Sequence, residues 1–81
     1  MKKEVVNIGN NTFVAGDVIR GITSYDSQSR RNELQIYRAA NRVTDATKGR
    51  RIRSLIFTTD GHVFLSTYSA ETISNRLIGK E

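Results

Sequence analysis

The 81-residue sequence has no cysteine, no proline and no tryptophan, and its only histidine is His62. Without cysteine the chain forms no disulfide, and a lone histidine cannot build a structural zinc site. A chain this short buries only about 60% of its unfolded surface, so its core gives modest stability. Oligomerisation is the remaining device that commonly stabilises small domains. We therefore expect a single domain over residues 1–81, with self-association as a hypothesis.

Long apolar segments are also absent. The sequence has no run of roughly 18 apolar residues and therefore predicts no membrane-spanning helix. Its first three residues, Met-Lys-Lys, resemble the start of a secretory signal, but Glu4 and a polar segment follow where an apolar block is needed. We expect a cytoplasmic protein without a membrane partner, which agrees with the lack of cysteine.

Acidic residues are few. Eight Asp and Glu stand against 13 Lys and Arg, which gives a net charge of +5 and a sequence pI of about 10.1. A positive excess of this size is typical of proteins that bind nucleic acid. Because basic residues also serve solubility alone, the charge by itself leaves both interpretations open.

The first third of the chain, residues 4–24, reads as strands broken by turns. β-branched residues alternate with two turn signals, at residues 9–11 and 16–17. The following segment has a helical pattern from residue 30 to about residue 42, with its apolar stripe formed by Leu34, Tyr37 and Ala40. Three capping candidates precede it: Asp26, Ser27 and Ser29. We expect an amphipathic helix that covers one face of a sheet and carries arginines outside its apolar stripe.

The strongest strand signals are at residues 52–58 and 63–67. Asp60-Gly61 between them predicts a two-residue type I′ turn, which would place Phe57 opposite Phe64 and Ile56 opposite Leu65. Both faces of this predicted hairpin are apolar. One face carries Leu55, Phe57 and Phe64, and the other carries Ile52, Ile56, Val63 and Leu65.

One helix covers only one face of a hairpin, so the second face requires the N-terminal strands or another copy of the chain. A contact between copies is expected to use either Phe57 and Phe64 or Ile56 and Leu65. At the end of the chain, Ser69 is a candidate N-cap of a short helix that includes Ile73. The predicted fold class is α+β: an antiparallel β-sheet with one central amphipathic helix and a short C-terminal helix.

Positive charge is concentrated between residues 42 and 53, which hold five of the 13 cations and one acid. Gly49 precedes Arg50 and Arg51, and Arg53 follows at the spacing that brings alternate strand residues to one face. Glycine permits the backbone to approach a ligand closely, and one guanidinium group can donate two parallel hydrogen bonds to a phosphate. The segment is a candidate phosphate-binding surface, and a solvated loop without function is the alternative.

Signals for an enzyme are weak. The glycine spacing of a nucleotide phosphate loop is absent, and the acidic residues have no pattern that would hold Mg²⁺ or Ca²⁺. His62 lies next to the Asp60-Gly61 turn without a second histidine or a serine nucleophile pattern. We expect a binding protein with no catalytic residues, no cofactor, no metal and no small-molecule substrate.

Collinear motifs along the chain resemble the RemA family of extracellular-matrix regulators, from about residue 5 to residue 77. The motifs are Val6-Asn7-Ile8-Gly9, Asp45-Ala46-Thr47, Gly49-Arg50-Arg51 with Arg53, His62 with Leu65-Ser66, and Glu71-Thr72 with Arg76-Leu77. The resemblance implies a non-enzymatic transcriptional activator of biofilm-matrix-type genes. It also implies a homo-oligomeric ring that binds double-stranded DNA through arginines around its rim.

On this resemblance, Arg50 and Arg51 are the expected DNA contacts, and Arg53 matches as well. Lys48 replaces a tyrosine of the family and adds a cation. Val18 stands where the family carries an arginine, and we expect Arg20 to act in its place because alternate residues of a strand share a face.

Two alternatives belong to other functional classes. One is an RNA-binding oligomer in which exposed Tyr25 or Phe13 stacks on bases. The other is a structural assembly protein without a nucleic-acid partner, in which Arg50 and Arg51 are buried against a neighbouring copy.

Overall fold

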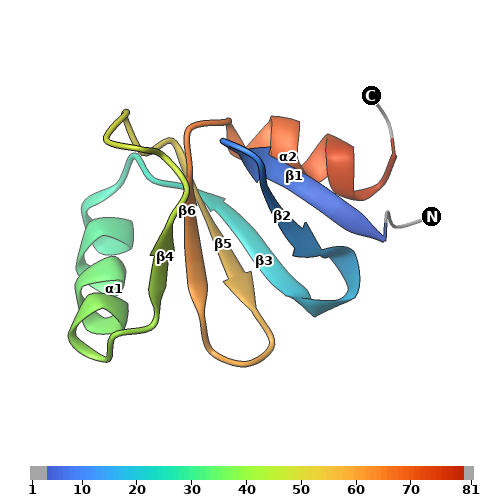
Figure 1. Cartoon of the computed structure of the whole chain (residues 1–81). Coiled ribbons are helices and arrows are strands. Elements are labelled where there is room, and N and C mark those ends of the chain that lie inside the picture. Colours follow the sequence, from blue (N-terminus) through green and yellow to red (C-terminus); the bar gives the residue numbers. More distant parts are fainter. Residues whose placement is uncertain (1–3, 80–81) are drawn as a thin grey trace.

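The computed structural model describes residues 4–79 and has three layers (Figure 1). Helix α1 covers one face of a four-stranded sheet, and an N-terminal hairpin with helix α2 covers the other. The elements in chain order are β1 (Val5–Gly9), β2 (Thr12–Ala15), the 3-10 turn η1 (Gly16–Val18), β3 (Ile19–Ser24), α1 (Gln28–Ala39), β4 (Val43–Asp45), β5 (Ser54–Thr58), β6 (Val63–Ser66) and α2 (Ala70–Leu77). The α+β class is confirmed.

The sheet has the order β3-β5-β6-β4 and is mixed rather than antiparallel. β3, β5 and β6 pair antiparallel, whereas β4 pairs parallel with β6. β4 was not predicted, because its three residues are too short to show a strand pattern. Helix α1 ends earlier than predicted, since Asn41 adopts a positive φ of 58° directly after the C-cap and turns the chain toward β4.

The β5–β6 hairpin is confirmed, but its predicted register is wrong by one residue. Its loop has three residues, because the Thr58 amide donates to the His62 carbonyl at 2.9 Å. Gly61 has a φ of 81° and Asp60 has none of the positive φ that a type I′ turn requires. Ile56 therefore pairs with Phe64, and Phe57 pairs with Val63.

This one-residue shift exchanges the faces of β6. Val63 and Leu65 pack with Leu55 and Phe57 under α1, and Phe64 lies on the other side. Register shifts of one residue always have this effect, because side chains alternate between the faces.

Both sheet faces are covered within one chain. The cluster under α1 contains Leu34, Leu55, Phe57, Val63 and Leu65. The opposite cluster contains Val6, Ile8, Val14, Ile19, Ala46, Ile56 and Ile73. The prediction that Phe57 with Phe64, or Ile56 with Leu65, forms a contact between copies is wrong for Phe57, Ile56 and Leu65, whose exposed fractions are 5%, 0% and 0%. Phe64 is half-buried and packs against the second cluster.

Side-chain hydrogen bonds fix the N-terminal hairpin and α2 against the sheet. The buried Ser66 hydroxyl donates to the Ile8 carbonyl at 2.6 Å. Arg76 donates from Nη1 to the Asn7 carbonyl at 2.9 Å, and its guanidinium lies 4.2 Å from the centre of the Tyr68 ring. These bonds hold β1 against the end of β6 and the last turn of α2 against β1.

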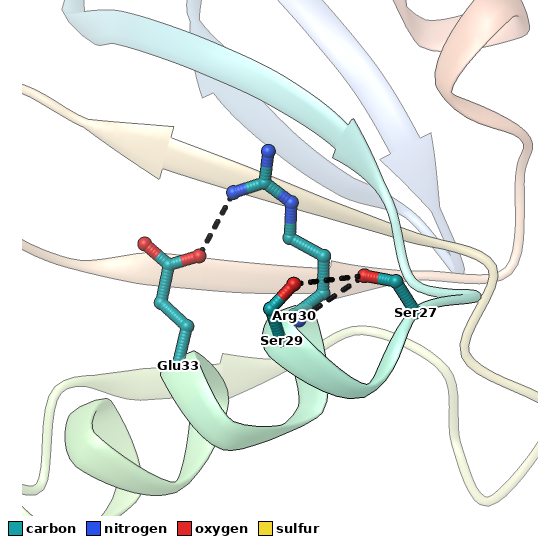
Figure 2. Close-up of polar contacts among 4 residues, drawn as sticks. All are labelled: Ser27, Ser29, Arg30 and Glu33. Atoms are coloured by element: carbon teal, nitrogen blue, oxygen red, sulfur yellow. Dashed lines mark hydrogen bonds and ion pairs between the residues drawn. The ribbon is translucent and has the colours of Figure 1, made fainter.

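Local capping signals are confirmed at both helices. The Ser27 hydroxyl accepts from the Arg30 amide at 3.2 Å, and the Arg30 guanidinium forms an ion pair with Glu33 at 2.9 Å (Figure 2). The Ser69 hydroxyl accepts from the Thr72 amide at 3.1 Å. Over residues 4–79, no helix is both long enough and apolar enough to cross a bilayer.

Candidate nucleic-acid interface

Three segments that are distant in sequence meet at one end of the sheet, the upper end in Figure 1. They are residues 24–26 after β3, residues 50–53 before β5, and Ser69 with Ala70 at the start of α2. Together with Arg31 in the first turn of α1, they line an open pocket of about 500 Å³. The pocket joins three of the predicted site residues: Arg50, Arg51 and Arg53.

Backbone hydrogen bonds hold the walls of this pocket in place. The Tyr25 amide donates to the Arg53 carbonyl at 3.2 Å, and the Arg53 amide donates to the Ser66 carbonyl at 2.8 Å. Ser54 is fully buried, and its hydroxyl donates to the Tyr68 carbonyl at 2.8 Å. Arg53 therefore extends from a backbone that is bonded on both sides, while its own side chain is exposed.

A tight turn over residues 47–50 positions Arg50 at the pocket. The Arg50 amide donates to the Thr47 carbonyl at 3.0 Å, and Lys48 and Gly49 between them have φ values of 52° and 82°. Two positive φ values in succession define a type I′ turn and explain the glycine. The turn is fixed at its start, because the buried Thr47 is bonded to Asp45.

The Asp45 carboxylate stabilises the residue that precedes the turn, Thr47. Its carboxylate accepts hydrogen bonds from the Thr47 hydroxyl and from the Thr47 amide, the latter at 2.8 Å. These bonds lower the pKa of Asp45 below its usual value because they favour the charged carboxylate, and they outweigh the opposing effect of partial burial. From the other side, the Asn10 amide group donates to the Ala46 carbonyl at 2.6 Å.

Apart from the contact of Arg31 with the Tyr25 ring, the guanidinium groups at the pocket carry charge that is not paired within residues 4–79. Arg31, Arg50, Arg51 and Arg53 are all exposed, and within residues 4–79 none of them forms an ion pair or a side-chain hydrogen bond. The Arg31 guanidinium lies 6.0 Å from the centre of the Tyr25 ring. Four arginines and one carboxylate, Asp26, give the lining a formal charge of +3 (4 − 1).

The other two predicted site residues lie outside the pocket. Lys48 is exposed in the adjacent turn and can extend a positive surface beyond the pocket. Arg20 lies four residues before Ser24 on β3, about 13 Å away along the strand. Its guanidinium is 5.8 Å from the centre of the Phe57 ring, on the side of the sheet that α1 covers.

The expectation that Arg20 shares a face with Val18 is wrong. Val18 belongs to the 3-10 turn and packs against the core cluster below the N-terminal hairpin, so the two residues are not on one regular strand. The β3–β5 register also shifts between Ile19 and Gly21, which breaks the alternation at Arg20.

Sequence reasoning missed Arg31 as a member of the site. It assigned this residue to the outer surface of the helix, since no spacing rule links it to Arg50 nearly twenty positions later. The usable signal was its place in the first turn of α1, next to the loop that ends β3. Because α1 begins shortly after the end of β3, its first turn lies near the end of the sheet where the pocket is.

His62 and Asp60 lie at the opposite end of the sheet and serve the hairpin loop. His62 Nε2 is 2.7 Å from the Thr44 hydroxyl, and Asp60 accepts from the Thr58 hydroxyl. The latter bond lowers the pKa of Asp60. Among residues 4–79, no cluster of His, Cys, Asp and Glu could hold a metal ion. The arginine pocket, by contrast, gathers positive charge that no ion pair within residues 4–79 neutralises, so it can bind a phosphorylated or otherwise anionic partner.

Comparisons with known proteins agree with the sequence motifs. Residues 5–77 match the family described as RemA-like, extracellular matrix regulatory protein A-like. A protein of Halothermothrix orenii is 37% identical over 81 residues, covering all of this chain and 96% of the relative. Proteins of Geobacillus thermodenitrificans and Bacillus cytotoxicus are 38% and 40% identical, again over the whole chain and 93% of each relative.

The names of these relatives assign them provisionally to regulatory proteins. Together with the family description, they indicate a regulatory role for this chain rather than an enzymatic one. Because the family match covers nearly the whole sequence, the chain belongs to the RemA-like family.

Proposed function

We propose that this protein is a non-enzymatic transcriptional regulator that binds double-stranded DNA through arginine–phosphate contacts. The observation that supports the proposal most strongly is the group of four exposed arginines that have no ion-pair partner within residues 4–79. The hydrogen bonds that fix the surrounding backbone do not involve these guanidinium groups, so their charge is available to a partner. An anionic partner would neutralise this charge. Because the family description is that of a regulatory protein, we propose DNA as this partner.

DNA binding by one chain is weak. Each neutralised phosphate contributes a slope of about −0.9 to the dependence of log affinity on log salt, so three or four contacts are lost readily at physiological salt. A homo-oligomeric ring repeats the contacts, and tethered sites can raise avidity by roughly 10²- to 10⁴-fold. The proposed active species is therefore the ring, as the family resemblance implies, and its proposed targets are biofilm-matrix-type genes.

Contacts to the DNA backbone rather than to base edges dominate in this proposal. Helix α1 packs its apolar stripe on the sheet and brings only the first turn, with Arg31, to the pocket. Within residues 4–79, Arg31 is the one charged helical residue in the pocket, so insertion of a helix into the major groove is not part of this proposal. Specificity would come from DNA shape and bending, repeated along the ring.

Assembly has a candidate surface that differs from the one predicted by sequence. Phe13 on β2 and Ile36 on α1 have exposed fractions of 57% and 70%, and their elements lie on opposite sides of the sheet (Figure 1). Phe13 borders a second pocket of about 410 Å³. Two unlike surfaces on opposite sides support head-to-tail contacts, the kind that close into rings when the rotation allows.

The decisive test of DNA binding is the double variant Arg50→Ala, Arg51→Ala. We expect the affinity for duplex DNA to fall on the order of 100-fold or more. The slope of log affinity against log salt should become less steep by the amount that corresponds to about two phosphate contacts per bound chain. Fluorescence anisotropy with a labelled duplex at two salt concentrations measures both. The matched control is Arg38→Ala, Arg42→Ala, which removes the same charge outside the pocket. Because Arg42 donates to the Asp60 carbonyl, circular dichroism checks that this variant keeps its fold.

Three results would redirect the proposal. Equal losses in the two double variants would mean that net charge matters and the pocket does not. Tighter binding of single-stranded RNA than of duplex at equal salt would favour an RNA-binding oligomer. Dissociation of the oligomer by the Arg50→Ala, Arg51→Ala variant would favour a structural assembly role for these arginines.

Assembly is tested by light scattering with Phe13→Asp and Ile36→Asp. The wild type is expected to have a mass several times that of the 9.1 kDa chain, and each variant should lower it, because a buried carboxylate is costly at an apolar contact. Gln35→Asp, at an exposed neighbour on α1, is the control and should leave the mass unchanged. A wild type that remains a 9.1 kDa monomer at micromolar concentration contradicts the ring.

A further inference from the structure

The arginine pocket is concave, and that shape fits a second kind of anion. A duplex has a convex surface, so in the proposed complex its phosphates would meet the exposed rim of the pocket. The pocket itself has about 500 Å³, within the range of roughly 300–1,000 Å³ that is typical of small-molecule sites. The proposed DNA contact at the rim would therefore leave the interior of the pocket without a ligand.

The charges surround this interior from different elements. Arg31 comes from α1, and Arg50, Arg51 and Arg53 come from the segment before β5. Cations gathered in this way repel one another, and the lining offers one carboxylate, Asp26, to offset them. A ligand with several negative charges in a small volume neutralises them together, which a single phosphate cannot do.

Other lining groups suit phosphates and a flat ring. The start of α2, at Ser69 and Ala70, forms part of the wall, and helix starts present amide groups that favour anions. The Arg31 guanidinium is held near the Tyr25 ring at 6.0 Å, and the free face of a guanidinium can stack on a base.

We propose that this pocket binds a free polyphosphate, either inorganic or the phosphate chain of a nucleotide, and that the bound ligand competes with DNA for the same arginines. The binding itself is independent of the proposed function, and only the competition rests on it. A small phosphorylated metabolite would thus control occupancy of the DNA by this regulator.

Direct binding is tested by isothermal titration of the wild-type protein with inorganic triphosphate, ATP and orthophosphate, without DNA and without divalent metal. We expect one triphosphate per chain, bound at least about 10-fold more tightly than orthophosphate, because several charge-assisted hydrogen bonds form at once. Equal affinities for ATP and triphosphate would identify the phosphate chain as the whole ligand. Tighter binding of ATP would identify a nucleotide.

Variants locate the site. Arg31→Ala and Arg53→Ala should each weaken triphosphate binding about 10-fold, and Arg31→Lys should recover part of the loss. Arg38→Ala, which removes an exposed arginine of α1 outside the pocket, should change it less than about twofold. Unsaturable binding, or an equal loss in Arg38→Ala, would overturn the proposal. Circular dichroism of each variant checks that the fold is retained.

The same samples separate this inference from the proposed function. Triphosphate should displace a labelled duplex from the wild type at concentrations near its own dissociation constant. A protein that binds duplex but not triphosphate refutes the pocket ligand and leaves the DNA-binding proposal intact. A protein that binds triphosphate but no duplex refutes the DNA-binding proposal and leaves the pocket ligand intact.

Discussion

The two ends of the sheet differ in how their polar groups are used. At the hairpin-loop end, Asp60 bonds to the Thr58 hydroxyl, His62 lies within hydrogen-bond distance of Thr44, and Arg42 donates to the Asp60 carbonyl at 3.3 Å. At the arginine end, the backbone is also hydrogen-bonded, but within residues 4–79 the guanidinium groups form no ion pair and no side-chain hydrogen bond, and only that of Arg31 lies over a ring, that of Tyr25.

This difference distinguishes groups that serve folding from groups that are available to a partner. Polar groups that are satisfied internally stabilise a loop, and changing them costs stability. Charged groups that are gathered without ion-pair partners add little to the stability of the folded state, so their substitution is expected to affect binding more than stability. The comparison therefore predicts that the hairpin-loop end is sensitive in stability measurements and the arginine end in binding measurements.

The largest expected effect tests whether both ends rest on one core. Leu55 on β5 is fully buried beneath α1, and Leu55→Ala should lower the free energy of unfolding by about 2–5 kcal/mol. Denaturant unfolding measures the loss, and hydrogen exchange reports both ends separately. If one end opens while the other keeps its protection, the two ends do not share a cooperative unit and the comparison must be made between independent parts.

Two glycines of equal strain give a sharper comparison. Gly61 in the hairpin loop and Gly49 in the turn before Arg50 have φ values of 81° and 82°. Alanine at either position should cost about 1–2 kcal/mol of stability, because the left-handed region is unfavourable for a side chain. Only Gly49→Ala should also weaken duplex binding, since it disturbs the placement of Arg50. Equal effects of the two variants on DNA affinity would contradict the division between the ends.

The smallest expected effect is a pH dependence at the turn of Asp45. Its pKa is lowered in the folded state, so its contribution is present above the unfolded value of about 3.9 and is lost as the pH falls through the folded value. Asp45→Asn should reduce stability near neutral pH by less than about 1 kcal/mol, since the group is largely exposed, and the difference should vanish in strong acid. Thermal unfolding from pH 2 to pH 7 measures it, and a constant difference across that range would remove the carboxylate's role.

Local features of the fold were predictable because few neighbours decide them. Ser27 and Ser69 were identified as caps from residues within a turn of them, and both accept the expected amide hydrogen bond. The register of the β5–β6 hairpin was not predictable from Asp60-Gly61, because that pair occurs both in two-residue type I′ turns and in three-residue loops with glycine last. The choice between these turns depends on which face of β6 the core accepts.

The candidate site was predictable only in part for the same reason. Arg50, Arg51 and Arg53 are neighbours in sequence, and the structure brings all three to one pocket. Arg31 joins them only through the packing of α1. Arg20 does not join them, because a 3-10 turn precedes β3 and a register shift interrupts the pairing of β3 with β5.

The sequence by itself determined where the positive charge is concentrated, where the helices and all strands except β4 lie, and membership in the RemA-like family. It did so because composition, capping and periodicity act over a few residues. Tertiary structure alone decided that the N-terminal hairpin and α2 cover the second sheet face, and that arginines from α1 and from the segment before β5 surround one pocket. Those outcomes depend on side-chain packing between distant segments, where the burial of Leu55, Ile56 and their neighbours selects one register and one arrangement.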